Sequence, residues 1–120
     1  MNGNLLRSKF YVCPQCGNIV RTMGETTVGC CGTTLSPLKA EEMDNEHQVV
    51  IENVEDEHFV TVNHAMTKDH YISFMAFFTS DRVQFVKLYP EGNAETRLNF
   101  RGGGYLYIYC NKHGLKKFKV

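Results

Sequence analysis

Four of the five cysteines lie close together near the start of the chain, as the Cys13-Pro14-Gln15-Cys16 knuckle and the adjacent pair Cys30-Cys31. Thiolates two residues apart in a turn can face one metal ion, and a second pair brought up by a hairpin completes a tetrahedral site of four sulfurs. A segment this short buries little apolar surface and usually needs a metal to fold. We therefore predict a four-cysteine metal module over residues 1–38. Both zinc and iron suit such a site, and the spacing does not choose between them.

The bulk composition argues against a nucleic-acid or membrane protein. The formal net charge is zero and the sequence pI is about 6.9. Bulk charge therefore does not favour binding to a nucleic acid or to an anionic membrane. No run approaches the roughly 18–20 apolar residues of a membrane span, and residues 1–7 lack the apolar core of a secretory signal. We therefore expect a cytoplasmic protein, in which cysteines stay reduced and favour metal binding over disulfides.

The remainder of the chain, residues 39–120, shows the pattern of an all-β domain. A charged connector over residues 39–46 precedes short apolar or alternating segments with turn residues between them. These predicted strands cover residues 48–51, 58–63, 71–78, 82–88, 95–100 and 105–110. Strands repeated about every ten residues favour an antiparallel sandwich. No segment has the pattern of a long amphipathic helix.

Histidines and the fifth cysteine mark a second candidate metal site in this β-domain. Cys110 and His113 are spaced to chelate one ion from a single turn, and His64 and His70 flank a short loop. His47 stands at the start of the first strand. Any one histidine is more often an ordinary residue than a ligand, but four of the five lie at strand ends or in loops. We expect His58 to be the exception and to face solvent, because it follows an acidic segment and begins an alternating strand.

Both halves of the chain resemble known iron proteins. The segments YVCPQCGNIV (residues 11–20) and GCCG (residues 29–32) resemble desulforedoxin and the matching N-terminal domain of desulfoferrodoxin. The segments NEHQV, NHAM, DHYI and CNKHG, at residues 45–49, 63–66, 69–72 and 110–114, resemble the motifs of the superoxide reductase family. The resemblance spans nearly the whole chain. It implies a desulforedoxin-like module followed by an immunoglobulin-like β-sandwich, in a homodimer.

The resemblance also implies a chemistry. His47, His64, His70 and His113 would be the equatorial ligands of a non-haem iron, with Cys110 as the axial thiolate. The protein would reduce superoxide to hydrogen peroxide and protect an anaerobic cytoplasm from oxidative stress. A rubredoxin-like protein would donate the electrons. The four-cysteine site, with iron or zinc, would relay electrons or only stabilise the dimer.

The chain departs from the family immediately before His47. The family has a glutamate and a lysine there, whereas this chain has Asn45 and Glu46. An anion in place of a cation should repel superoxide, since charges a few Å apart near a surface interact by roughly 1–4 kcal/mol. Lys68 or Lys112 could supply the missing positive charge. Alternatively, Glu46 itself could bind the sixth position of the iron.

Two other functions remain open from the sequence. The same sites would suit a redox sensor or partner-regulated iron protein, which the Asn45-Glu46 departure favours and which a slow reaction with superoxide would reveal. A structural zinc protein is the third hypothesis. Four imidazoles with a thiolate argue against zinc in the second site, because zinc prefers four ligands, and metal content would decide. Phosphate-binding loops, nucleophile elbows and paired catalytic carboxylates are not recognisable in the sequence.

Overall fold

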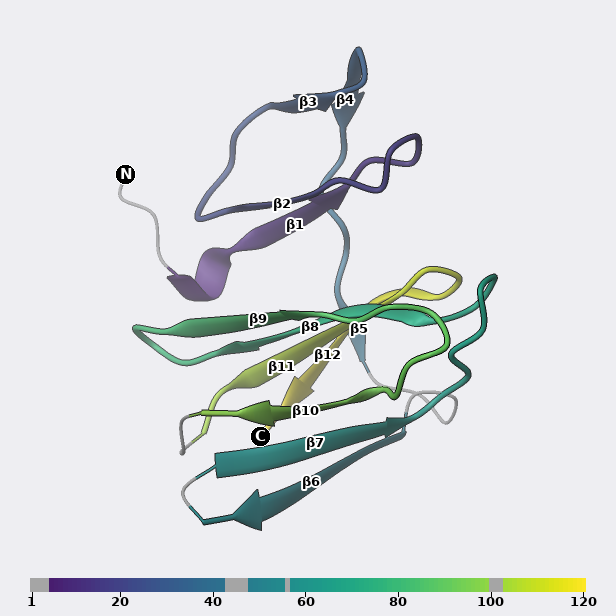
Figure 1. Ribbon diagram of the computed structural model, residues 1–120. Coiled ribbons are helices and arrows are strands. Elements are labelled where there is room, and N and C mark those ends of the chain that lie inside the picture. Colours follow the sequence, from purple (N-terminus) through teal and green to yellow (C-terminus); the bar gives the residue numbers. More distant parts are fainter. Residues whose placement is uncertain (1–4, 43–47, 56, 100–102) are drawn as a thin grey trace. The chain divides into compact units, whose positions relative to one another are not determined.

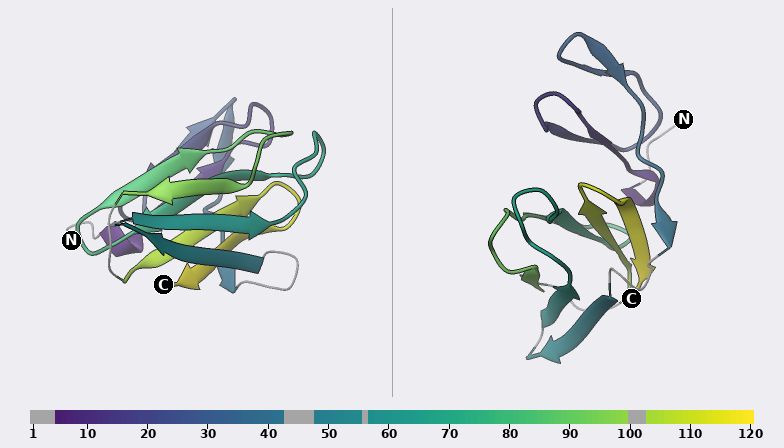
Figure 2. Two further views of the ribbon diagram at one scale, coloured as in Figure 1. Left: turned by 60° about the horizontal axis from the view of Figure 1, so that its bottom comes forward. Right: turned by 90° about the vertical axis from the view of Figure 1, so that its right-hand side faces the viewer.

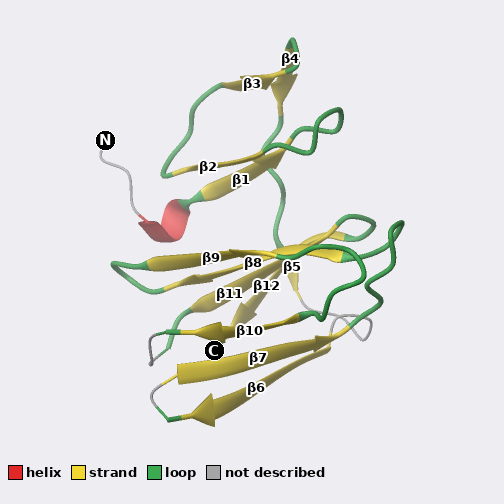
Figure 3. Ribbon diagram, in the orientation of Figure 1, coloured by secondary structure: helices red, strands yellow, loops and turns green. Residues whose placement is uncertain are grey.

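Strands make up just over half of the residues that the computed structural model describes, which are residues 5–42, 48–55, 57–99 and 103–120 (Figures 1 and 3). The chain divides into two units, Met1–Lys39 and Ala40–Val120. The helical structure in the described ranges is one short 3₁₀ turn, η1 (Leu5–Arg7). None of the described residues forms a helix with the length and hydropathy needed to cross a membrane. The predicted all-β fold class is confirmed.

The first unit consists of two small antiparallel hairpins. They are formed by β1 (Lys9–Val12) with β2 (Ile19–Thr22), and by β3 (Val28–Cys30) with β4 (Thr33–Leu35). Its buried cluster contains Tyr11, Cys13 and Leu35, with Val20 and Val28 packed against it. So small an apolar cluster stabilises a fold weakly, in keeping with a module that depends on its cysteines.

The second unit is a sandwich of two sheets (Figure 2). One sheet has the order β10-β7-β6 and the other the order β5-β12-β11-β8-β9. The strands are β5 (Glu41–Glu42), β6 (Gln48–Val54), β7 (Glu57–Asn63), β8 (Ile72–Phe78), β9 (Val83–Lys87), β10 (Glu95–Leu98), β11 (Tyr105–Cys110) and β12 (Gly114–Lys119). The core between the sheets takes Val60 and Val62 from β7, and Met75 and Ile108 from β8 and β11. The predicted antiparallel sandwich is therefore present, with the short β5 as a parallel edge strand beside β12.

The last strand, β12, was not predicted from the sequence. It pairs with β11 along its whole length, from Cys110 opposite Gly114 to Tyr105 opposite Lys119. Its lysines obscure the alternation of apolar and polar residues that would predict a strand. A lysine can occupy a partly buried position, because its alkyl stem lies along an apolar surface while the ammonium reaches water. Lys116 is buried, and Lys117 lies 4.4 Å from the centre of the Tyr105 ring. Part of the predicted connector also pairs with this strand, as β5.

The prediction that His58 faces solvent is wrong. The side chain is only 8% exposed, and it belongs to the inward row of β7 together with Val60 and Val62. Its ring meets Phe77 edge-on, with the centroids 5.8 Å apart. The Asn53 side-chain oxygen lies 2.9 Å from Nδ1 and satisfies that ring nitrogen. The alternation of inward and outward residues along β7 therefore decides the orientation of His58, despite the acidic segment before it. The ring can be buried because buried polar groups are tolerated when they are hydrogen-bonded.

Gly104 provides a test of the packing at the start of β11. A Cβ at this position would overlap the carbonyl oxygen of Phe78 and lie 3.1 Å from the Phe77 ring. We expect Gly104→Ala to lower the free energy of unfolding by about 1–3 kcal/mol, because both neighbours are held in a packed sheet. Urea denaturation would measure this. The control is Gly92→Ala, whose Cβ would meet the Tyr89 carbonyl oxygen at 3.4 Å; an equal loss in both variants would contradict the packing argument.

Candidate metal centres

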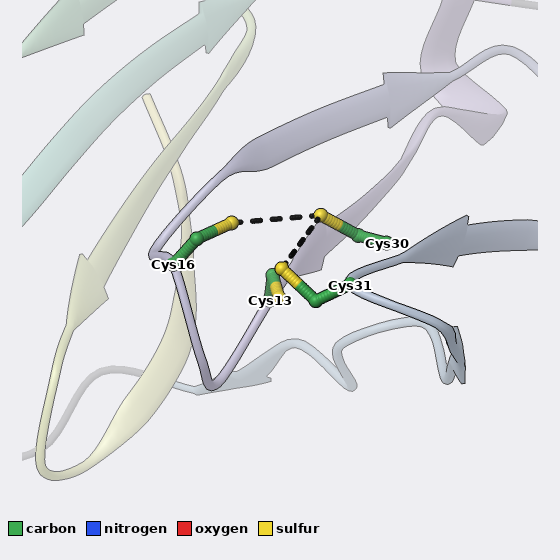
Figure 4. Close-up of side chains that lie close together, drawn as sticks. All are labelled: Cys13, Cys16, Cys30 and Cys31. Carbon is green, nitrogen blue, oxygen red and sulfur yellow. Dashed lines mark hydrogen bonds between the residues drawn. The ribbon is translucent and has the colours of Figure 1, made fainter.

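The loop between β1 and β2 turns the first two cysteines toward one point. The Cys13 N–H donates to the Asn18 carbonyl over 2.9 Å, and the Gly17 N–H donates to the Cys13 carbonyl over 2.9 Å. Gly17 has a φ of 75°, which residues with a Cβ adopt only under strain. These constraints form a tight knuckle in which the sulfurs of Cys13 and Cys16 both face the second cysteine pair (Figure 4).

The hairpin between β3 and β4 explains why adjacent cysteines can act together. Cys30 pairs with Thr33, so Cys31 and Gly32 are the two loop residues. Both have positive φ, 54° and 75°, as two-residue hairpin loops of this kind require. Neighbouring side chains in a strand point to opposite faces, but the turn brings the Cys30 and Cys31 sulfurs to 3.9 Å.

The four sulfurs form one cluster with the chemistry of a metal site. They all lie within 4.8 Å of one another, and the Cys16 and Cys30 sulfurs are 3.5 Å apart. Backbone N–H groups of Cys16 and Gln15 lower the pKa of Cys13 to about 6. Hydrogen bonds with the other thiols, Cys16 first, raise the pKa of Cys31 to about 12. Four thiolates at this spacing repel one another, so the arrangement favours a metal cation bound between them.

A second cluster gathers at one end of the sandwich. His64 follows the last residue of β7, and His70 lies two residues before β8. Cys110 ends β11, and His113 lies in the turn before β12. Because β11 pairs antiparallel with both β8 and β12, the end of β11 meets the starts of the other two strands. Each side chain offers one ligand atom, and these four atoms all lie within 4.8 Å of one another.

The three imidazoles surround a buried sulfur. The His64 and His70 ring centroids are 4.5 Å apart, and those of His70 and His113 are 4.9 Å apart. Cys110 Sγ lies 3.4 Å from His64 Nε2 and 3.5 Å from His113 Nδ1. Cys110 is fully buried, whereas His113 is exposed. The cluster thus has a buried side at the thiol and an open side at the surface.

Two ring nitrogens show that the cluster fits a metal ion. His64 Nδ1 lies 2.6 Å from the Ala65 carbonyl oxygen; a carbonyl only accepts, so Nδ1 carries the proton and Nε2 turns its lone pair toward Cys110. His70 Nε2 is buried and has no hydrogen-bond partner among the described residues. A buried polar atom without a partner is costly and calls for an explanation. A metal ion bound by this nitrogen would remove the cost.

Asn111 joins the two segments that carry the cluster. Its side-chain oxygen accepts a hydrogen bond from the Tyr71 N–H over 2.9 Å, and its side-chain nitrogen donates to the Asp69 carbonyl over 2.9 Å. These bonds fix the backbone on both sides of His70 against the turn that carries His113. The sequence analysis did not single out Asn111, although it stands between Cys110 and His113 in the CNKHG segment.

The structure places the other predicted site residues only in part. Asn45, Glu46 and His47 lie outside the described residues, so a role for His47 as a fifth ligand stays a prediction. Lys68 and Lys112 are exposed and belong to the loops that carry His70 and His113. The structure therefore brings together eight of the nine predicted ligands, in two groups of four.

Comparison with known proteins links this arrangement to one family. The sequence profile of the desulfoferrodoxin family matches residues 39–119. A desulfoferrodoxin from Clostridium acetobutylicum is 32% identical over 60 residues, which are 50% of this chain and 48% of that relative. The chain therefore matches about half the length of this curated relative.

Solved structures share the fold. The superoxide reductase from Treponema pallidum superposes with a TM-score of 0.83 at 24% identity, over 95% of this chain and 99% of that one. The one-iron superoxide reductase from Giardia intestinalis gives a TM-score of 0.55 at 16% identity, over 64% of this chain and 98% of that one. The first match includes the four-cysteine unit, because it spans almost the entire chain.

Substitution of Asn111 tests whether its two hydrogen bonds position the second cluster. We expect Asn111→Ala to weaken metal binding by about 10–100-fold, the usual cost of losing a group that orients ligands. Competition with a chelator, followed by metal analysis, would measure the change. The control is Asn93→Ala, which removes a side chain bonded to Glu95 in an exposed loop. Unchanged affinity in Asn111→Ala would show that the strands alone fix the ligands.

Removal of metal from the four-cysteine cluster should unfold the first unit before the second. Its apolar cluster is small, whereas the sandwich has an extensive core of its own. We expect a strong chelator to increase amide hydrogen exchange in β1 to β4 and to leave β8 and β11 protected. Cys13→Ser should reproduce this pattern without chelator. Protection of β1 to β4 after complete metal removal would contradict the expectation.

Proposed function

The chain belongs to the desulfoferrodoxin family, and from this premise we propose that it is a non-haem iron oxidoreductase that reduces superoxide to hydrogen peroxide. The reaction is placed at the cluster of His64, His70, Cys110 and His113. The observation that carries the proposal is the convergence of three imidazoles on a buried thiol, with His70 Nε2 left without another partner among the described residues. Nitrogen and thiolate ligands together suit iron that changes its oxidation state.

The side chains of the site have separate roles. When bound, iron supplies the one electron that, with two protons from solvent, converts superoxide to hydrogen peroxide. Cys110 holds its sulfur on the buried side, away from solvent, which protects the thiol from the peroxide product. His113 is on the exposed side, where a small anion can enter and leave. His64 is fixed in orientation by its bond to the Ala65 carbonyl.

The remaining assignments extend this proposal. Residues 1–38 form a desulforedoxin-like module and residues 39–120 a superoxide reductase domain, with His47 as a fifth ligand. The four-cysteine cluster holds a second iron, or zinc, and relays electrons or stabilises the module. The protein works in the cytoplasm as a homodimer, and a rubredoxin-like protein reduces it.

The charges near the open side should set the rate with superoxide. Glu46 replaces a cation of the family motif with an anion, which opposes the approach of an anionic substrate. Lys112 adjoins His113 and Lys68 lies two residues before His70, and both are exposed. We propose that these lysines replace the missing positive charge. If they do not, the same scaffold would serve as an iron-based redox sensor, which the Asn45-Glu46 pair favours.

Pulse radiolysis of the reduced, iron-loaded protein would test the function. We expect superoxide to oxidise the wild type rapidly, with growth of the ferric-thiolate absorbance, and Glu46→Lys to react about ten-fold faster because a repulsion becomes an attraction. Lys112→Ala should react more slowly. Lys119→Ala is the matched control, since Lys119 lies at the opposite end of β12 from the cluster.

The outcomes separate the two functions. A fast wild type that slows in Lys112→Ala supports superoxide reduction with a relocated cation. A slow wild type that becomes fast only in Glu46→Lys would reject efficient superoxide removal and favour the sensor. Absence of any oxidation by superoxide in an iron-loaded protein would reject both the reaction and its proposed site.

A further inference from the structure

Three aromatic rings are stacked across neighbouring strands of the five-stranded sheet. Strand β8 lies between β9 and β11 (Figure 1). Phe74 belongs to β8, Phe85 to β9 and Tyr109 to β11. The Phe85 and Phe74 centroids are 4.9 Å apart with planes at 28°, and those of Phe74 and Tyr109 are 5.4 Å apart at 16°. In the register, Tyr109 is directly opposite Phe74, and Phe85 is diagonal to it on the same face. The rings form one continuous stack.

The two ends of this stack have different surroundings. Phe85 is 43% exposed and lies on β9, an edge strand. Phe74 is fully buried. At the other end, Tyr109 is bonded through the backbone to Cys110, whose sulfur belongs to the histidine cluster. The stack therefore leads from the protein surface to the residue that is covalently bonded to Cys110.

The proposed reaction requires a route by which electrons reach the iron. The iron must be reduced again after each superoxide, and a donor protein cannot contact the fully buried Cys110 sulfur. Electron tunnelling weakens steeply across empty space and less through bonds and contacting rings. Because superoxide needs the open side near His113, a separate entry on the edge strand β9 would let the donor bind without covering the substrate's path.

We propose that Phe85, Phe74 and Tyr109 carry electrons from a docked one-electron carrier protein to Cys110, with Phe85 as the point of entry. The inference rests on the proposed function and names how its site is reduced. In each event the carrier is oxidised by one electron and the ferric iron held by Cys110 becomes ferrous. No atom or proton has to cross the stack.

The surface around Phe85 indicates the chemistry of the carrier. Tyr89 is 66% exposed and adds a second aromatic side chain close along the chain. Lys87 lies between them, with its ammonium 4.5 Å from the Tyr89 ring centre and bonded to the Ser73 and Leu88 carbonyls. An apolar surface with a fixed cation fits a small acidic carrier with an apolar contact face.

Substitution of the middle ring tests the route directly. Phe74→Leu keeps an apolar side chain but interrupts the stack. The matched control is Phe78→Leu, because Phe78 is equally buried on the same strand and face but contacts Tyr107 instead. With reduced rubredoxin at saturating concentration as the probe, stopped-flow absorbance should show a limiting rate of iron reduction several-fold lower in Phe74→Leu and unchanged in Phe78→Leu.

Binding provides a readout that does not depend on turnover. Zinc-loaded protein cannot accept an electron, so an NMR titration with rubredoxin would report docking alone. We expect Phe85→Asp to weaken binding, and Phe74→Leu to bind as the wild type does. Phe85→Leu should lower the limiting reduction rate with little loss of binding. Because Phe85 is exposed, this variant should fold normally and tests the route even if the buried Phe74→Leu variant misfolds.

Three results would overturn the proposal. These are an unchanged limiting rate in both Phe74→Leu and Phe85→Leu, an equal loss in Phe78→Leu, and unaltered binding of rubredoxin to Phe85→Asp. The ferric protein for these experiments is made with ferricyanide, so the route is tested even if superoxide does not react. Failure of the proposed function is then seen separately, as absence of oxidation of the ferrous wild type by superoxide.

Discussion

The antiparallel pairing of β11 with β8 and β12 is the constraint on which the second cluster depends. It brings Cys110, at the end of one strand, beside the segments that begin the other two. A shift of one residue in either register would turn the Cys110 sulfur to the other face of the sheet. The Asn111 side chain then ties the turn after β11 to the backbone on both sides of His70. Strand register and the hydrogen bonds of Asn111 thus set the positions of the ligands.

The two clusters are built by different kinds of contact, and this explains how far each could be predicted. The four-cysteine cluster comes from two local turns, so the CxxC knuckle and the adjacent pair were sufficient to predict it. The second cluster joins residues far apart in the sequence; the contact between His64 and Cys110, for example, spans 46 positions. Their positions at strand ends and in loops marked its members as candidates, and the resemblance to known motifs implied that they are ligands, because spacing alone cannot show which strand ends meet.

The errors have the same physical origin. His58 was expected at the surface because the residues before it are acidic, but its position in β7 turns its side chain toward the core, where Asn53 satisfies its ring nitrogen. β12 was missed because its lysines conceal the alternation of a strand that is buried by pairing with β11. Asn111 was overlooked because both of its partners lie about forty residues away in sequence. In each case a contact with another strand or segment decides the role, and the local sequence pattern does not show that contact.

Burial of Cys110 has consequences on both sides of the cluster. A thiolate inside the sandwich is stabilised only if positive charge is close to it, which ties the integrity of this end of the fold to a bound cation. The same burial removes the sulfur from direct contact with any partner protein. Electrons that reduce the proposed iron through this sulfur would therefore cross part of the protein, whereas a small anion could approach the exposed side near His113 directly. In the proposed reaction, burial of the Cys110 sulfur would thus separate the path of the substrate from the path of the reductant.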